Sequence, residues 1–159
     1  MKIGIISDTH GDYGAIAAAV QAAGKVDLWL HAGDCCDDAN YLAEASKTKV
    51  IGVMGNCDWP APGRKTDQII EAGGRRIFLT HGHLYGVNRG AGALVAEAAA
   101  NSCDIAIYGH THIPAEIKAG GVLVLNPGSV SRPRGGNETS FAILDFADEQ
   151  SAIQFKNLE

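Results

Sequence analysis

Residues 2–34, KIGIISDTHGDYGAIAAAVQAAGKVDLWLHAGD, decide the fold of this 159-residue chain. The apolar run at 2–7 ends in polar residues, which is typical of a buried strand. Residues 12–23 place alanine and isoleucine at helical spacing, and Gly24 can end that helix. Residues 27–32 read as a second strand. A strand, a helix and a strand in this order predict parallel strands joined by a helical crossover.

The same alternation continues with a predicted helix at 39–46 and a strand at 49–54, and then the pattern changes. Two glycine pairs, at 73–74 and 120–121, each separate short apolar runs and predict β-hairpins. No linker or repeat interrupts residues 1–159, so we expect a single α/β domain. The remaining predicted elements are strands at 68–72, 75–80, 105–108, 116–119, 122–125, 140–146 and 152–155 and a helix at 91–100.

Composition and charge favour a soluble globular protein and disfavour several partners. Hydrophobic residues make up 46% and charged residues 19% of the chain, which is ordinary for a packed domain. The net charge of −5 gives no overall basic surface for stable binding of nucleic acid. The first apolar run is too short for a signal peptide or a membrane span. Four cysteines without a C-x-x-C pair predict free thiols, and we expect a cytoplasmic protein.

Polar side chains follow the ends of the predicted strands, where α/β folds bind their ligands. Each segment alone is weak evidence, because an aspartate at a strand end is often a turn former or a helix cap. Together they place carboxylate, amide and imidazole donors beside glycines that let the backbone bend. Such donors suit Mn²⁺, Fe²⁺, Ni²⁺ or Zn²⁺. The segments are DTH at 8–10, GD at 33–34, GNCD at 55–58, HGH at 81–83 and GHTH at 109–112.

These segments resemble the D-x-H, G-D, G-N-H-[DE], H and G-H-x-H pattern of the calcineurin-like metallophosphoesterase family, and NPGS at 126–129 extends the match. The short chain resembles the small single-domain phosphodiesterase branch of that family. The resemblance implies two mixed β-sheets packed as a sandwich and flanked by helices, with the site at one edge. It also implies the catalytic metal ligands: Asp8, His10 and His112 for a first ion, Asn56, His81 and His110 for a second, and Asp34 for both.

The predicted function follows from two divalent cations, for which we expect Mn²⁺ first, with Ni²⁺, Fe²⁺, Co²⁺ and Zn²⁺ as alternatives. A hydroxide that bridges two ions about 3.5–4 Å apart is nucleophilic near neutral pH and can attack phosphorus in line. We therefore expect a phosphodiesterase that acts on small phosphoesters, without a stable nucleic-acid or membrane partner. The sequence leaves a phosphatase activity and a homo-oligomer open.

One position departs from the family pattern. Cys57 stands where the family has a histidine that is thought to protonate the leaving group. The simplest interpretation is a small buried residue; as a substrate contact it would be a poorer acid and favour good leaving groups. His83 is a candidate to contact the substrate, to act as the displaced acid or to support His81. Arg132 and Arg134 either clamp a phosphate or lie on a solvated loop.

Two other classes of function compete with this prediction. An interaction scaffold is the main alternative, because a retromer subunit that resembles these small proteins acts through binding. A nuclease acting on DNA ends is another, and the acidic balance disfavours it. All seven ligand positions keep chemically competent side chains, which favours an enzyme. His31 lies inside a predicted strand and is expected to be structural rather than a ligand.

Overall fold

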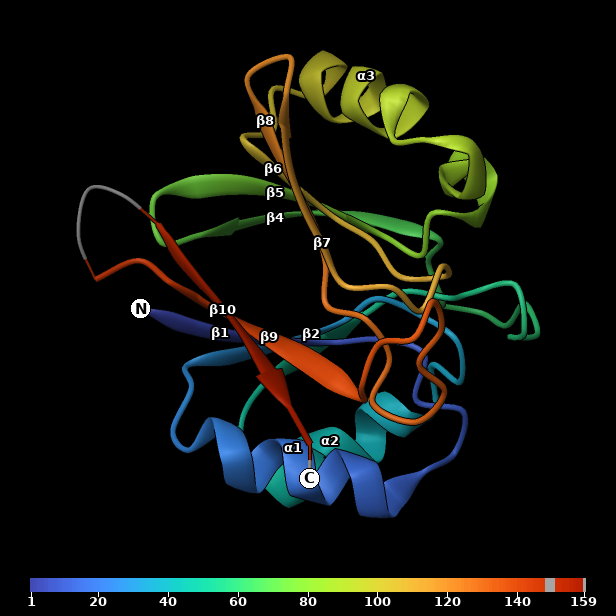
Figure 1. Ribbon diagram of the computed structural model, residues 1–159, viewed down its shortest axis with the longest axis vertical. Coiled ribbons are helices and arrows are strands. Elements are labelled where there is room, and N and C mark those ends of the chain that lie inside the picture. Colours follow the sequence, from blue (N-terminus) through green and yellow to red (C-terminus); the bar gives the residue numbers. More distant parts are fainter. Residues whose placement is uncertain (148–150, 159) are drawn as a thin grey trace.

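Two facing β-sheets with helices outside them form the architecture of the computed structural model, which describes residues 1–147 and 151–158. Helices α1 (Tyr13–Ala23) and α2 (Asp38–Ser46) cover one sheet, and α3 (Gly92–Ala100) covers the other (Figure 1). The predicted sandwich is therefore confirmed. Each helix and strand expected from the sequence is present, with boundaries that differ by no more than two residues.

The first sheet grows out of the N-terminal stretch. Its order is β10-β9-β1-β2-β3, and β1 pairs in parallel with β2, as β2 does with β3. Helices α1 and α2 are the crossovers between these strands, and α1 begins where Asp12 Oδ1 accepts a hydrogen bond from Ala15 N. The strands are β1 (Lys2–Ile6), β2 (Leu28–His31), β3 (Val50–Gly52), β9 (Ser140–Asp145) and β10 (Ala152–Asn157).

The second sheet contains both predicted hairpins. Its order is β4-β5-β6-β8-β7, with β5, β6 and β8 parallel and the two outer strands antiparallel to their neighbours. Gly73 and Gly74 turn the first hairpin with φ angles of 59° and 71°, which side chains other than glycine rarely adopt. The strands are β4 (Asp67–Ala72), β5 (Arg75–Thr80), β6 (Ile105–Ile107), β7 (Ala115–Ala119) and β8 (Val122–Asn126).

Apolar side chains fill the space between the layers. Ile5 and Leu79 belong to the cluster between the two sheets, Trp29 of β2 belongs to one cluster with Ile16 of α1, and Leu94 anchors α3. Each fully buried side chain of this size contributes about 1.5–3 kcal/mol relative to an exposed one. The rigid sheets therefore fix the positions of the loops that follow their strands.

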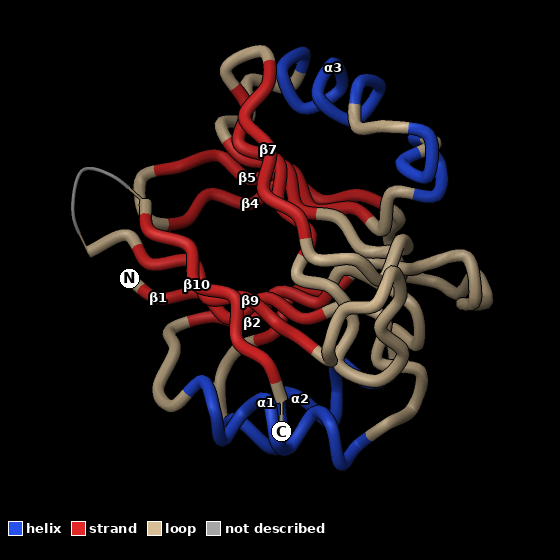
Figure 2. The backbone as a smooth tube through the Cα atoms, viewed as in Figure 1, coloured by secondary structure: helices blue, strands red, loops and turns tan. Residues whose placement is uncertain are grey.

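Those loops gather at one end of the sandwich, as the tan segments of Figure 2 show. The loops that follow β1, β2, β5 and β6 all lie at this end, because the four parallel strands point the same way. Two short 3₁₀ turns, η1 (His83–Tyr85) and η2 (Val87–Arg89), continue from β5. Among the described residues, no helix has the length and apolar character needed to span a bilayer.

Candidate metal centre

Five predicted ligands lie on residues with left-handed backbone. The φ angles are 54° at Asp8, 47° at His10, 56° at Asp34, 68° at His110 and 58° at His112. This conformation costs a residue other than glycine about 1–2 kcal/mol. Such strain persists only where the surrounding structure holds it, and it gathers at functional sites. The sharp turns after the strands aim these side chains into one space.

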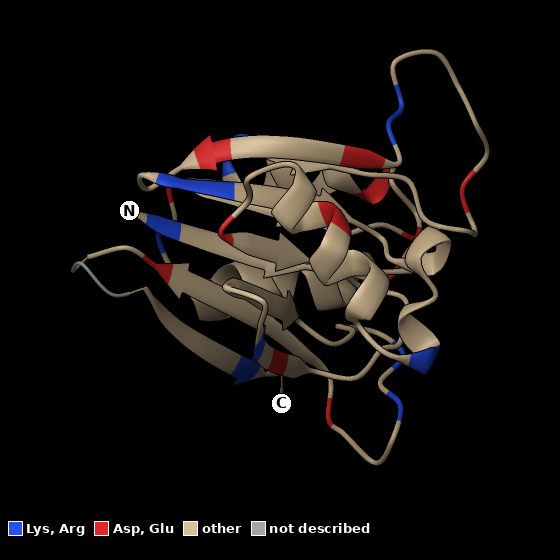
Figure 3. Ribbon diagram, turned by 90° about the horizontal axis from the view of Figure 1, so that it is seen from above, with Lys and Arg blue, Asp and Glu red and all other residues tan. Residues whose placement is uncertain are grey.

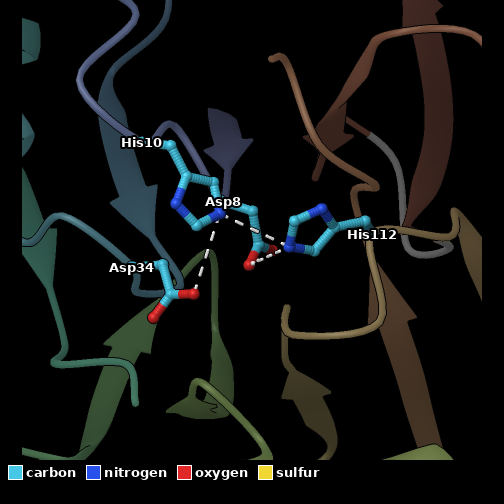
Figure 4. Close-up of side chains that lie close together, drawn as sticks. All are labelled: Asp8, His10, Asp34 and His112. Atoms are coloured by element: carbon cyan, nitrogen blue, oxygen red, sulfur yellow. Dashed lines mark hydrogen bonds and ion pairs between the residues drawn. The ribbon is translucent and has the colours of Figure 1, made fainter. Parts of the chain in front are cut away.

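Four of these side chains form a first ligand group, which we call group one. Single donor atoms of Asp8, His10, Asp34 and His112 all lie within 4.8 Å of one another, and the side chains point together in Figure 4. The Nε2 atoms of the two histidines are 3.5 Å apart, and His112 Nε2 is 3.1 Å from Asp8 Oδ1. Ligands about 2.1 Å from a divalent ion are spaced by about 3.0–3.4 Å, so this group fits a cation.

The carboxylate of Asp8 gives the sharpest sign of a missing partner. Its Oδ2 accepts hydrogen bonds from Ser7 Oγ and His110 N. Its buried Oδ1 has no hydrogen-bond partner among the residues that the structure describes, although His112 Nε2 is nearby. Buried oxygens are almost always satisfied. Burial opposes ionisation of Asp8, but contacts with His112 and His81 outweigh it and lower its pKa, so the carboxylate is ready to bind a cation.

Asn56, His81 and His110 form a second ligand group, group two. Asn56 Oδ1 is 3.0 Å from His81 Nε2 and 2.9 Å from His110 Nδ1. Asp34 belongs to group one and also faces group two. Its Oδ2 is 3.8 Å from His10 Nε2 of group one, and its Oδ1 is 3.4 Å from His81 Nε2 of group two. The structure therefore brings all seven predicted ligands together, with one Asp34 oxygen facing each group.

Backbone carbonyls and one amide orient the histidine rings. His81 Nδ1 lies 2.7 Å from Ala32 O, and His112 Nδ1 contacts Arg132 O. A neutral ring that donates its Nδ1 proton to a carbonyl keeps the Nε2 lone pair free for a metal. His110 is reversed, because its Nδ1 faces the site and its Nε2 lies 2.9 Å from Asn88 Nδ2. Sequence reasoning missed Asn88, and no motif marks it.

Residues 1–149 match a family model described as the calcineurin-like phosphoesterase superfamily domain. The chain belongs to this family. It is 34% identical over 158 residues to YsnB of Bacillus subtilis, named a probable metallophosphoesterase, covering 98% of this chain and 90% of that protein. It is 40% identical over 106 residues to the phosphodiesterase YfcE of Escherichia coli, covering 61% of this chain and 53% of YfcE.

A solved structure supports the same assignment. A predicted phosphoesterase of Streptococcus pneumoniae superimposes with a TM-score of 0.83 at 33% identity, covering 98% of this chain and 88% of that one. The agreement extends over nearly the whole metallophosphoesterase fold. It therefore includes both sheets and the loops that carry the two ligand groups.

Two glycines in the metallophosphoesterase motifs permit close approach of the ligands. A Cβ atom at Gly55 would overlap Asp34 Oδ1, and one at Gly33 would lie 2.7 Å from His81 Nδ1. Neither position can carry a side chain without displacing a ligand. The expectation that glycines let the ligand loops converge is confirmed at these two positions.

The histidines differ in their readiness to lose a proton. Burial lowers the pKa of His10 and of His110, so both rings favour the neutral form that binds metal. His112 differs, because its contact with Asp8 raises its pKa against the effect of burial. A cation entering group one must therefore compete with a proton on His112.

Cys57 is exposed, so its interpretation as a small buried residue is wrong. The loop of residues 55–58 turns its side chain outward while Cys57 N donates to Asp34 Oδ1 at 3.0 Å. Partial cover of the thiol and its interaction with Asp34 raise its pKa to about 11. The group is a thiol, not a thiolate, at neutral pH. It therefore stands beside the carboxylate of Asp34 as a weak proton donor.

The remaining candidates lie beside the ligands without replacing them. The His83 ring is centred 5.4 Å from that of His81 and 6.1 Å from that of His110. Its buried Nδ1 has no hydrogen-bond partner within residues 1–147 and 151–158. Arg132 is exposed. Burial has the largest effect on the pKa of His10 and lowers it, Asp34 raises it, and the positive charge of Arg132 lowers it. The charge of Arg132 therefore acts on His10 of group one.

Proposed function

We propose that this metallophosphoesterase is a phosphodiesterase that binds one divalent cation in each ligand group and hydrolyses small phosphoesters. The observation that carries the proposal is the carboxylate of Asp34, which presents Oδ1 to group two and Oδ2 to group one. A carboxylate shared in this way is the arrangement of two-metal hydrolases. The phosphodiesterase name of the relative YfcE supports the choice of a diester over a monoester.

Held by the two ligand groups, divalent cations would supply a water that is nucleophilic near neutral pH and would neutralise charge on the phosphoryl oxygens. The chain itself holds the ligands in place: His81 and His112 are fixed through carbonyl contacts at Nδ1, and the low pKa of Asp8 keeps it ionised. Arg132 adds positive charge at the rim of group one and favours approach of a phosphate. We expect Mn²⁺, with Ni²⁺, Fe²⁺, Co²⁺ or Zn²⁺ as substitutes.

The proposal places the substrate among small molecules in the cytoplasm. Basic and acidic residues are interspersed over the view of Figure 3, and the net charge is −5, so long polyanions gain little from this surface. The four cysteines are free thiols, which favours a reducing compartment.

Metal analysis followed by an activity screen tests the proposed function. Protein freed of metal with a chelator and reloaded with Mn²⁺, Ni²⁺ or Co²⁺ is expected to bind two ions per chain and to hydrolyse an aryl phosphodiester faster than the aryl monoester. The chelated protein is expected to be inactive. Faster monoester hydrolysis would replace the proposal with a phosphatase. Absence of hydrolysis with every metal would favour an interaction scaffold of the same fold.

A further inference from the structure

A chain of buried hydrogen bonds lies directly behind the ligand loops. Its members are Thr9, His31 and Asp38, none of which belongs to either ligand group. Thr9 and His31 are fully buried, and Asp38 is 3% exposed. Thr9 Oγ1 lies 3.0 Å from His31 Nε2 and 2.6 Å from Asp38 Oδ2. Two titratable groups and a hydroxyl are thus removed from water, which is costly unless they are hydrogen-bonded.

The donors and acceptors of this chain have one consistent direction. Gly33 N donates to His31 Nδ1 at 3.2 Å, so the ring proton lies on Nε2 and is donated to Thr9 Oγ1. The Thr9 hydroxyl then donates to Asp38 Oδ2, which also accepts from Gly11 N at 2.8 Å. Burial lowers the pKa of His31, which agrees with this neutral ring. Each proton therefore has a defined acceptor.

The two ends of this series of hydrogen bonds are backbone amides next to two predicted metal ligands. Gly33 directly precedes Asp34, and Gly11 directly follows His10. Thr9, in the middle, lies between Asp8 and His10, and its Oγ1 is also 3.3 Å from Asp34 O. The hydrogen bonds consequently join the loop after β1 to the loop after β2, and both loops have left-handed residues that need such support.

We propose that Thr9, together with His31 and Asp38, positions the carboxylate of Asp34 relative to His10, and so determines how well this carboxylate serves both ligand groups. The inference rests on the two-cation site of the proposed function. Thr9, His31 and Asp38 are positioning residues, because their hydrogen bonds are to one another and to the backbone of the ligand loops. The 3.8 Å distance between His10 Nε2 and Asp34 Oδ2 is the quantity that they control.

Substitution of Thr9 tests this role with little change in volume. Thr9→Val removes the hydroxyl and keeps the shape, whereas Thr9→Ser keeps the hydroxyl. Thr139→Val is the matched control, because it removes a threonine hydroxyl that donates to Leu158 O at 3.1 Å, between the residue before β9 and the residue after β10. The measurements are Mn²⁺ affinity by calorimetry, magnetic coupling between two Mn²⁺ ions by electron paramagnetic resonance, kcat and KM, and thermal unfolding of the metal-free protein.

Thr9→Val is expected to weaken Mn²⁺ binding by about 10–100-fold, as loss of an outer partner of a metal ligand does. It should also weaken the magnetic coupling and lower kcat more than it raises KM. Thr9→Ser should restore affinity and coupling to near the wild-type values, and Thr139→Val should leave both unchanged. A protein with Thr9→Val that binds two coupled Mn²⁺ ions with wild-type affinity would overturn the inference.

The inference and the proposed function can fail separately. If the wild-type protein binds a single Mn²⁺ ion, the two-cation proposal fails. Thr9→Val must still lower the affinity for that ion, because His10 and Asp34 both belong to group one. If Thr9→Val does not fold, Asp38→Ala takes its place, since it removes the acceptor shared by Thr9 and Gly11. Unchanged Mn²⁺ affinity in a folded Asp38→Ala variant would overturn the inference as well.

Discussion

The two ligand groups share Asp34 and similar donor types, yet they are built differently. In group one, Asp8 is fully buried, His112 is 2% exposed and only His10 of its histidines is partly exposed. In group two, His81 is fully buried, but Asn56 is exposed and His110 is partly exposed. Behind group one lies the buried chain of Thr9, His31 and Asp38, whereas His110 of group two is held from outside by Asn88. Burial strengthens electrostatic attraction and slows exchange with water. We therefore expect a tightly held ion in group one and a more exchangeable ion in group two.

This difference also indicates the side from which a substrate arrives. Cys57 and His83 both lie next to group two in the chain, and Cys57 is exposed. A phosphoester can thus reach the exchangeable ion from the side on which Cys57 is exposed. The comparison between the groups is open to experiment at several positions, beginning with the residue that both groups need.

Asp34→Asn is expected to have the largest effect. Neutralising the shared carboxylate removes the charge that holds two cations close together, and kcat should fall by about a thousand-fold or more, as when a preorganised charge-stabilising group is lost. Metal analysis should find at most one ion per chain. Retention of two ions and of most of the activity would show that Asp34 is not shared. Glu116→Gln on β7 is the control, because it neutralises an exposed carboxylate on an outer strand.

Asn88→Ala should affect group two alone. The amide of Asn88 contacts His110 Nε2 at 2.9 Å, and loss of such a partner weakens metal binding by about 10–100-fold. Calorimetric titration with Mn²⁺ should show a weaker second binding event and an unchanged first one. Asn137→Ala is the matched control, since that exposed amide donates to Arg134 O within its own loop. A weakened first event would contradict the division into two groups.

The sequence predicts the elements from local pattern, and it predicts the ligands because its motifs resemble those of the family. Alternating strands and helices place Asp8, Asp34 and His81 after strands that point the same way, and glycines such as Gly55 reveal where the chain approaches a ligand. Asn88 and the Thr9 hydroxyl carry no such signal, because their partners lie 22 and 29 residues away along the chain. Such partners are determined by packing of the sheets rather than by any motif.

Exposure is also hard to predict from the sequence at a turn. Cys57 is of a residue type that is often buried, and its neighbours do not indicate which way its side chain points. In the structure, Asp58 Oδ2 accepts from Gly55 N and Asp58 Oδ1 from Cys36 N, and these bonds fix the turn. The turn presents Cys57 to solvent. Its side-chain direction therefore depends on a carboxylate that closes the loop, not on the character of cysteine.

The pH dependence of metal binding should separate the groups further. Asp8 raises the pKa of His112, so His112 is protonated at a higher pH than His110. A cation that binds in group one must then displace this proton. The pKa of His110 is lowered by burial, so its proton competes only at a lower pH. Below the pKa of His112, Mn²⁺ affinity of group one should fall about tenfold per pH unit, the slope for one displaced proton. Calorimetry from pH 8 to pH 5 measures both events, and a parallel decline of both would contradict the assignment.

Cys57→His has the smallest expected effect, and it tests the exposed group from the side of the substrate. The thiol has a pKa of about 11, so it protonates a departing alkoxide poorly, and rates should depend steeply on the leaving-group pKa. An imidazole at position 57 is a better acid near neutral pH and should raise kcat about two- to tenfold, for poor leaving groups only.

Rates across a series of aryl and alkyl phosphodiesters, measured for wild type, Cys57→His and Cys57→Ser, test this prediction. Because the backbone N–H of Cys57, which every variant keeps, donates to Asp34 Oδ1, metal content should be the same in all three. A flat leaving-group dependence in the wild type would mean that another acid is present, and His83, whose ring lies beside both histidines of group two, would then be the residue to substitute next.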